Sequence, residues 1–208
     1  ANTAGTSGGA IQAMTVVSME VERCTFLRNE AGSHGGAINH ERQPGSLRIE
    51  HSVFRLNVAG KGVSIVAATA SGAGSNEGSQ SSPSSGAVEV ADSSDGQVLP
   101  DGGAVLGSRI GMLVLDSTFE GNTALAGSGG SIACLTCIQT EFTNTYVVAS
   151  AAVRGGAIMV ADTDDFVLLS NVTVRACTAA LSGGAVFVRL NTQPEHGLQV
   201  LRSTLSGN

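Results

Sequence analysis

Apolar and polar residues alternate in short runs along much of the chain. One run of apolar and small positions recurs three times, as Leu47, Ile49, Ser52 and Phe54, as Met112, Val114, Ser117 and Phe119, and as Leu198, Val200, Ser203 and Leu205. Alternation with a period of two over short runs predicts β-strands. No amphipathic stretch is long enough to predict a helix.

A Gly-Gly pair followed by a small and an aliphatic residue recurs six times. It reads GGAI, GGAV or GGSI, and its first glycines are Gly8, Gly35, Gly102, Gly129, Gly155 and Gly183. The gaps between them are therefore 27, 67, 27, 26 and 28 residues. We interpret the long gap as a degenerate copy at KGVSI (61–65) followed by an insertion. A fixed period in this range indicates a repeat architecture.

A second landmark, close to S-x-F-x-x-N, accompanies the glycine pairs. Its aromatic position holds Phe26, Phe54, Phe119 and, in a weaker copy, Phe142. Its last position holds Asn29, Asn57, Asn122 and Asn208, with Thr145 and Cys177 in the weaker copies. We expect the phenylalanines to stack as an internal ladder and the asparagines to mark a bend, with their amides bonded along the axis.

These repeats predict an all-β fold, a right-handed single-stranded parallel β-helix of six to seven coils with a period of about 27 residues. Asn-Gly turns between neighbouring strands are absent, so hairpins are not expected. Each strand would instead pair with its counterpart one coil later, roughly 4.8 Å away. We expect residues 1–208 to form a single domain that is part of a longer chain, with the Ser/Gly-rich segment 71–85 as a flexible inserted loop.

The combination of GGAI and FxxN resembles the repeats of the chlamydial polymorphic outer-membrane proteins. The resemblance extends over nearly the whole chain and implies a pectin-lyase-like, right-handed β-helix. It also implies a secreted or surface-displayed protein of adhesive or structural kind. The glycine pairs are expected to be coil corners, because Gly permits positive φ and close approach of neighbouring coils.

Composition narrows the classes of partner. The chain has 208 residues, 42% hydrophobic and only 3% aromatic, with a formal net charge of −6. No cluster of Lys and Arg offers contacts to phosphates, so nucleic acid is not expected as a partner. No run of 18 apolar residues predicts a membrane-spanning segment. No cofactor is expected either.

Two cysteines form a lone CxxC motif, Cys134 and Cys137, at an expected tight corner. Neither a helix start nor a second pair supports redox or zinc chemistry there. We expect a Cys134–Cys137 disulfide, with pairing of either to Cys177 and buried free thiols as the alternatives. Cys24 is expected to point inward, beyond disulfide reach of the others.

Catalysis has one candidate in the acidic run Asp162, Asp164 and Asp165, which could bind Ca²⁺ or supply an acid/base pair. The run lies between two strands, where Asp is a usual turn residue. The four histidines have no partner at metal-ligand spacing. We therefore expect no enzyme activity and no metal site.

The sequence favours an extracellular or cell-surface structural or adhesive module, which could serve as a unit of a surface filament. Expected partners are other protein subunits or a host or matrix surface, glycans, and copies of the chain stacked through coil ends. The alternative is a polysaccharide-binding or polysaccharide-degrading β-helix protein. Asn171, in the sequon Asn171-Val172-Thr173, is the predicted glycosylation site.

Overall fold

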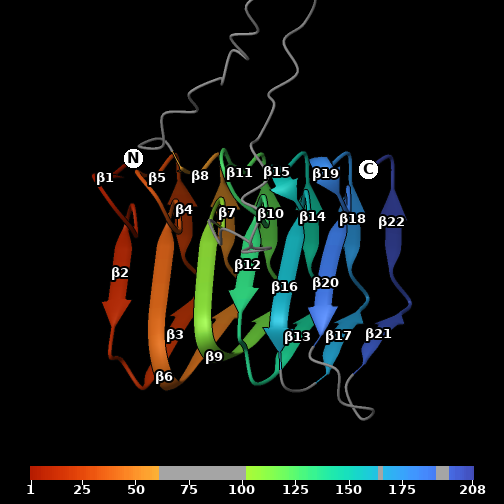
Figure 1. Cartoon of the computed structure of the whole chain (residues 1–208), viewed down its shortest axis with the longest axis horizontal. Helices are drawn as coiled ribbons and strands as arrows, with labels where there is room; N and C mark the ends of the chain where they lie inside the picture. The colour runs from red at the N-terminus through yellow and green to blue at the C-terminus, as the bar shows by residue number, and fades with distance from the viewer. Residues whose placement is uncertain (61–101, 164–165, 191–196) are drawn as a thin grey trace, which may run out of the picture. The chain divides into compact units, whose positions relative to one another are not determined.

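The computed structural model describes residues 1–60, 102–163, 166–190 and 197–208, which contain 22 β-strands and no helix (Figure 1). All of them lie in one compact unit formed by Ala1–Val63 and Val98–Asn208. The Ser/Gly-rich segment 71–85 and the KGVSI segment lie outside the described residues.

Three parallel sheets share these strands. The first contains β1 (Thr3–Ala4), β5 (Glu30–Ala31), β8 (Val58–Ala59), β11 (Thr123–Ala124), β15 (Ala151–Arg154) and β19 (Thr178–Ser182). The second contains β4 (Thr25–Leu27), β7 (Val53–Arg55), β10 (Thr118–Glu120), β14 (Tyr146–Val148), β18 (Thr173–Arg175) and β22 (Thr204–Ser206).

The third sheet has ten strands, because two long strands continue across a corner at which the other coils are divided into two strands. The long strands are β6 (Ile38–Glu50) and β9 (Val105–Leu115). The divided coils contribute β2 (Ile11–Met14) and β3 (Ser18–Glu22), β12 (Ile132–Leu135) and β13 (Thr140–Thr143), β16 (Ile158–Thr163) and β17 (Val167–Ser170), and β20 (Val186–Leu190) and β21 (Leu198–Leu201).

The chain visits the sheets in turn and rises by one strand at each circuit, which makes a parallel β-helix. Level 1 runs from β1 to β4, level 2 from β5 to β7, level 3 from β8 to β10, level 4 from β11 to β14, level 5 from β15 to β18 and level 6 from β19 to β22. Figure 1 shows the levels in chain order, from red to blue. Bonded partners on neighbouring levels are typically 27 or 28 residues apart. The predicted fold class is confirmed, with five steps between six levels.

Levels 2 and 3 pair directly, although the chain of level 3 is much longer between β8 and β9 than the chain of the other levels at this corner. Ile38 on β6 is in register with Val105 on β9, and Phe54 on β7 with Phe119 on β10. No level therefore comes between them, and the prediction that KGVSI supplies a missing coil of the stack is wrong. A regular period cannot distinguish an extra coil from an insertion at a corner.

Aromatic rings stack inside the helix over the first three levels. The rings of Phe26 and Phe54 lie 4.6 Å apart between centroids, and those of Phe54 and Phe119 lie 4.8 Å apart. Val147 continues the row at level 4, so the expectation that Phe142 belongs to it is wrong. Phe142 is instead buried on β13, in register with Val114. The sequence Thr140-Glu141-Phe142 resembles the S-x-F landmark, but it lies one strand earlier in the coil than the landmark does.

A row of buried amides runs beside the phenylalanines. The side-chain oxygen of Asn57 accepts hydrogen bonds from the backbone and side-chain nitrogens of Asn29, at 3.0 and 2.9 Å. Asn122 accepts the same pair of bonds from Asn57. Asn2 extends the row below Asn29, and Asn208 accepts a bond from the backbone nitrogen of Cys177.

Level 4 places Ser150 in this row, bonded to the hydroxyl of Ser131, which also accepts a bond from Asn122. Thr145, expected in the Asn place, occupies the earlier Ser place instead and donates to the carbonyl oxygen of Thr143. The prediction for Thr145 is wrong because its position was counted from Phe142, which lies one strand earlier than the Phe of the landmark.

The glycine pairs form the corners before the third sheet, as predicted. The first glycine of each pair has φ between 48° and 71°, a region that disfavours other residues. The second glycine lies against the next level, since a Cβ on Gly36 would overlap the carbonyl oxygen of Gly103. Two different constraints therefore require the two glycines.

Replacement of Gly130 by Ala tests the close approach between levels. The new Cβ would collide with the carbonyl oxygen of Gly156 and with the backbone of Ala151, so we expect a loss of about 2 kcal/mol or more in unfolding free energy. Urea denaturation followed by circular dichroism measures the change. The control is Gly111→Ala, whose Cβ would meet nothing closer than 4.0 Å. Equal midpoints for the two variants would contradict the steric account.

Replacement of Asn122 by Ala tests the amide row. The change leaves the buried donors of Asn57 and the carbonyl oxygen of Phe54 without their partner, so we expect a cost of about 3 kcal/mol in unfolding free energy. Asn2→Ala is the matched control, because Asn2 is an exposed donor at the end of the row. Thermal denaturation of both variants should show a much larger loss for Asn122→Ala.

Candidate functional site

The acidic run of the sequence does not form a cluster among the described residues. The carboxylate of Asp162 pairs with the guanidinium of Arg189 on the next level, at 2.8 Å. Asp164 and Asp165 lie outside the described residues. Asp162 has a φ of 56°, so it serves as a corner residue tied to its neighbour level.

The CxxC motif carries a disulfide between Cys134 and Cys137, and both residues are fully buried. The corner is not especially tight, contrary to expectation, because level 4 takes ten residues from Ile132 to Phe142, whereas level 3 takes nine from Val105 to Val114. Cys24 is exposed, contrary to expectation, because no level lies below level 1 in the described structure. Burial raises the pKa of the Cys177 thiol, so this free cysteine is held as a neutral thiol.

One exposed corner carries a polar residue at every level, directly after the third sheet. This outer corner row consists of Arg23, His51, Asp116, Asn144, Asn171 and Arg202. All six have φ between 46° and 53°, the left-handed region that Asn, Asp and His tolerate best among non-glycine residues. Asn171 donates to Asn144 at 2.8 Å, and Asn144 donates to Asp116 at 2.9 Å.

Asn171, the predicted glycosylation site, is thus exposed but already bonded, and the neighbouring Val172 is buried. The orientation of the two residues agrees with the sequence analysis. Glycosylation itself stays a prediction.

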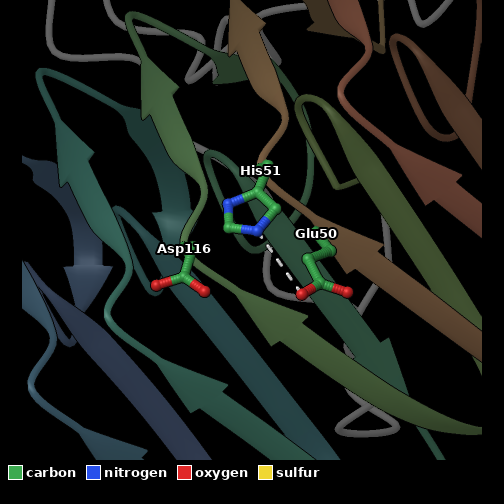
Figure 2. Close-up of side chains that lie close together, drawn as sticks. All are labelled: Glu50, His51 and Asp116. Carbon is green, nitrogen blue, oxygen red and sulfur yellow. Dashed lines mark ion pairs between the residues drawn. The ribbon is translucent and has the colours of Figure 1, made fainter.

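The amide contacts of the outer corner row end at Asp116, and a cluster of potential metal ligands begins there. Glu50, His51 and Asp116 each offer one ligand atom, and the three atoms lie within 4.8 Å of one another. Figure 2 shows the two carboxylates on either side of the imidazole ring. His51 Nε2 lies 3.5 Å from Glu50 Oε1.

Glu50 is held from its other side by Arg48. Both Nε and an Nη nitrogen of Arg48 donate to Glu50 Oε2, at 3.1 and 2.6 Å, and this pairing raises the pKa of the Arg48 guanidinium. Oε1 of Glu50 therefore remains directed to His51. Arg48 also lies 3.5 Å from Glu20 on level 1.

Sequence reasoning missed this cluster because it judged each histidine by spacing along the chain. His51 and Asp116 are 65 residues apart, yet each directly precedes the Ser of the S-x-F landmark. Alignment of the landmarks would have placed both residues at one corner on consecutive copies. Only the direct pairing of levels 2 and 3 makes them neighbours.

A shallow hollow of about 340 Å³ lies on the outer face of the third sheet. Its lining combines charged and neutral side chains from four levels, including Glu20, Arg48, Leu113, Gln139 and Glu141. The hollow faces solvent, so it can contact an extended ligand but does not enclose one.

His40 is a buried polar residue of the interior. It fits because its neighbours in register are the small residues Ala13 and Gly107. Its Nε2 lies 3.2 Å from the carbonyl oxygen of Val16, while its Nδ1 has no hydrogen-bond partner in the described part of the chain. Desolvation lowers the pKa of His40, and burial likewise lowers that of His34.

The comparisons with known proteins agree with the fold. The family model of the Chlamydia polymorphic membrane protein repeat matches residues 116–135. This segment runs from the corner residue Asp116 through Phe119 and Asn122 to the end of β12, so it contains both landmarks. The chain is a parallel β-helix, and it contains a repeat similar to those of this family. No curated protein and no solved structure gives a significant match.

Nothing in the described part of the chain is a helix with the length and apolar character needed to cross a bilayer.

Acidification should destabilise the fold through His40. Because its pKa in the folded state lies below the usual 6.5, the unfolded chain binds more protons as pH falls, and the unfolding free energy decreases below about pH 6.5. Urea denaturation between pH 8 and pH 5 measures this decrease. We expect His40→Met, which removes the titrating group from the interior, to flatten the dependence and leave a remainder from His34. An unchanged pH dependence in the variant would rule out His40 as the source.

Proposed function

We propose that the chain is an extracellular or cell-surface structural or adhesive module, a unit of a surface filament in which a stiff β-helix presents corners and loops. The observation that carries this proposal is the Chlamydia polymorphic membrane protein repeat, which is embedded in a regular stack of levels. A solenoid suits such a role because each level contacts only its neighbours and the stack presents extended faces.

The last described level supports assembly in line with further coils. Several inward-facing residues at level 6 are exposed to solvent. The exposed fractions of Leu198, Val200 and Leu205 are 45%, 42% and 45%. Their equivalents at level 3, Met112, Val114 and Phe119, are buried. An open strand edge with apolar side chains is a template for another strand. Additional coils, or a second copy of the chain, would cover this edge.

Exposed faces give the module its other partners, which we propose to be protein subunits, a host or matrix surface, or glycans. The outer corner row offers a line of charged and amide side chains, and the exposed Asn171 within it is the residue that we propose to be glycosylated. Such groups suit a polar contact surface. We propose no role in nucleic-acid binding, in keeping with the net charge of −6.

Polysaccharide binding is the second candidate, favoured by the hollow on the third sheet. Its acidic residues Glu20 and Glu141 lie three levels apart along one register, which is about 14 Å at the usual strand spacing. Glycosidases need their two carboxyl groups roughly 5–10 Å apart. The hollow therefore supports contact with a polymer better than cleavage of one, and we propose that the chain is not an enzyme.

Immunogold electron microscopy on intact cells of the source organism tests the proposed function. Antibodies raised against the folded recombinant chain should label the outer surface, and a filament role predicts labels aligned along fibres. Preincubation with the purified chain is the control and should abolish the signal. Labelling that requires permeabilised cells would contradict a surface role.

A further inference from the structure

We propose that Glu50, His51 and Asp116 bind a divalent first-row transition metal ion, with Zn²⁺ as the reference case. The three residues offer one imidazole nitrogen and two carboxylate oxygens from adjacent levels, all within 4.8 Å of one another. Imidazole and carboxylate together suit Zn²⁺ and its first-row neighbours, whereas Ca²⁺ and Mg²⁺ prefer oxygen ligands alone.

The distance between two of the ligand atoms already fits a metal centre. Ligands bound at about 2.1 Å in a tetrahedral site lie about 3.4 Å apart. His51 Nε2 and Glu50 Oε1 lie 3.5 Å apart, so one ion could contact both without a rearrangement of the backbone. Asp116 is exposed, and its ligand atom lies within 4.8 Å of the other two, so a rotation of its side chain would let its carboxylate reach the same ion.

Neighbouring side chains orient both carboxylates. Arg48 holds only Oε2 of Glu50 and leaves Oε1 for the ion. Asn144 donates to Oδ1 of Asp116 at 2.9 Å and leaves Oδ2 free. Hydrogen bonds of this kind fix the direction of a metal ligand and strengthen binding. Arg48 also balances one of the two negative charges when no ion is bound.

Backbone conformation explains the residue types of the row but not this grouping. The left-handed corner admits Asn, Asp or His at any level. At levels 3 to 5 the row is joined by hydrogen bonds from Asn144 to Asp116 and from Asn171 to Asn144. Between levels 2 and 3, no hydrogen bond links His51 to Asp116 among the described residues, and Glu50 is turned toward the imidazole. A bound ion would link levels 2 and 3, as the amide hydrogen bonds link levels 3 to 5.

The test is isothermal titration calorimetry of the full chain with ZnCl₂, after removal of metals with a chelator. A Cys24→Ser background removes the exposed thiol, a competing zinc ligand, and the equivalent residues Ser52 and Ser117 indicate that Ser fits there. We expect one saturable site. His51→Asn and Asp116→Asn should each lower the affinity at least about tenfold. Asn is the chosen replacement because Asn144 and Asn171 occupy the same corner.

Glu22→Gln is the matched control, since it removes an exposed carboxylate one level below Glu50 without touching the three ligands. Its affinity for Zn²⁺ should equal that of the background chain. Visible absorption of the Co²⁺ complex gives a second readout, which should disappear in His51→Asn. Absence of saturable binding would overturn the proposal, as would equal affinity in all variants.

Discussion

The spacing of all the levels depends on the close contact between the backbones of successive glycine pairs. At the second glycine of the first five pairs, the next level approaches so closely that a single methyl group would meet a carbonyl oxygen. Strand pairing in all three sheets requires one common rise per level, so one corner cannot be wider than the others. The six Gly-Gly pairs recur because the corner admits no larger residue, and the sheets, the stacked rings and the buried amides all keep the spacing that it permits.

Within that spacing, each level supports its neighbours through rows of like residues. Stacked Phe26, Phe54 and Phe119 fill the interior, and Asn29, Asn57 and Asn122 satisfy buried backbone groups at the adjacent bend. Substitutions within a row are accommodated locally, as at level 4, where Ser150 and Ser131 replace the amide contact by a hydroxyl pair. The outside of the helix is less constrained. There, the left-handed corner fixes the backbone but leaves the chemistry of the side chain to vary from level to level.

Repetition made the fold predictable, because the period, the alternation and the glycine corners all point to one architecture. Predictions failed where residues imitate a landmark or where the period is interrupted. Thr140-Glu141-Phe142 has the form of the strand landmark but lies on the preceding strand, and a count of 28 residues from Phe119 leads to Val147 instead. The cluster of Glu50, His51 and Asp116 could not be read from the period, because it depends on which levels meet across the interruption. The disulfide was expected at the correct pair of cysteines, although the corner is not the shortest one.

The direct pairing of β6 with β9 joins parts of the chain that are far apart in sequence, and this junction between levels 2 and 3 forms a seam in the stack. Across this seam, partners such as Phe54 and Phe119 are 65 residues apart, whereas Phe26 and Phe54 are separated by 28. The longer connection adds about 0.7 kcal/mol of loop-closure entropy, a small thermodynamic cost that is met before the contacts of the seam form. On either side of the seam, bonded partners on neighbouring levels are typically 27 or 28 residues apart, so their contacts close shorter loops. We therefore expect the contacts between levels on each side of the seam to form before the contacts that join the two sides.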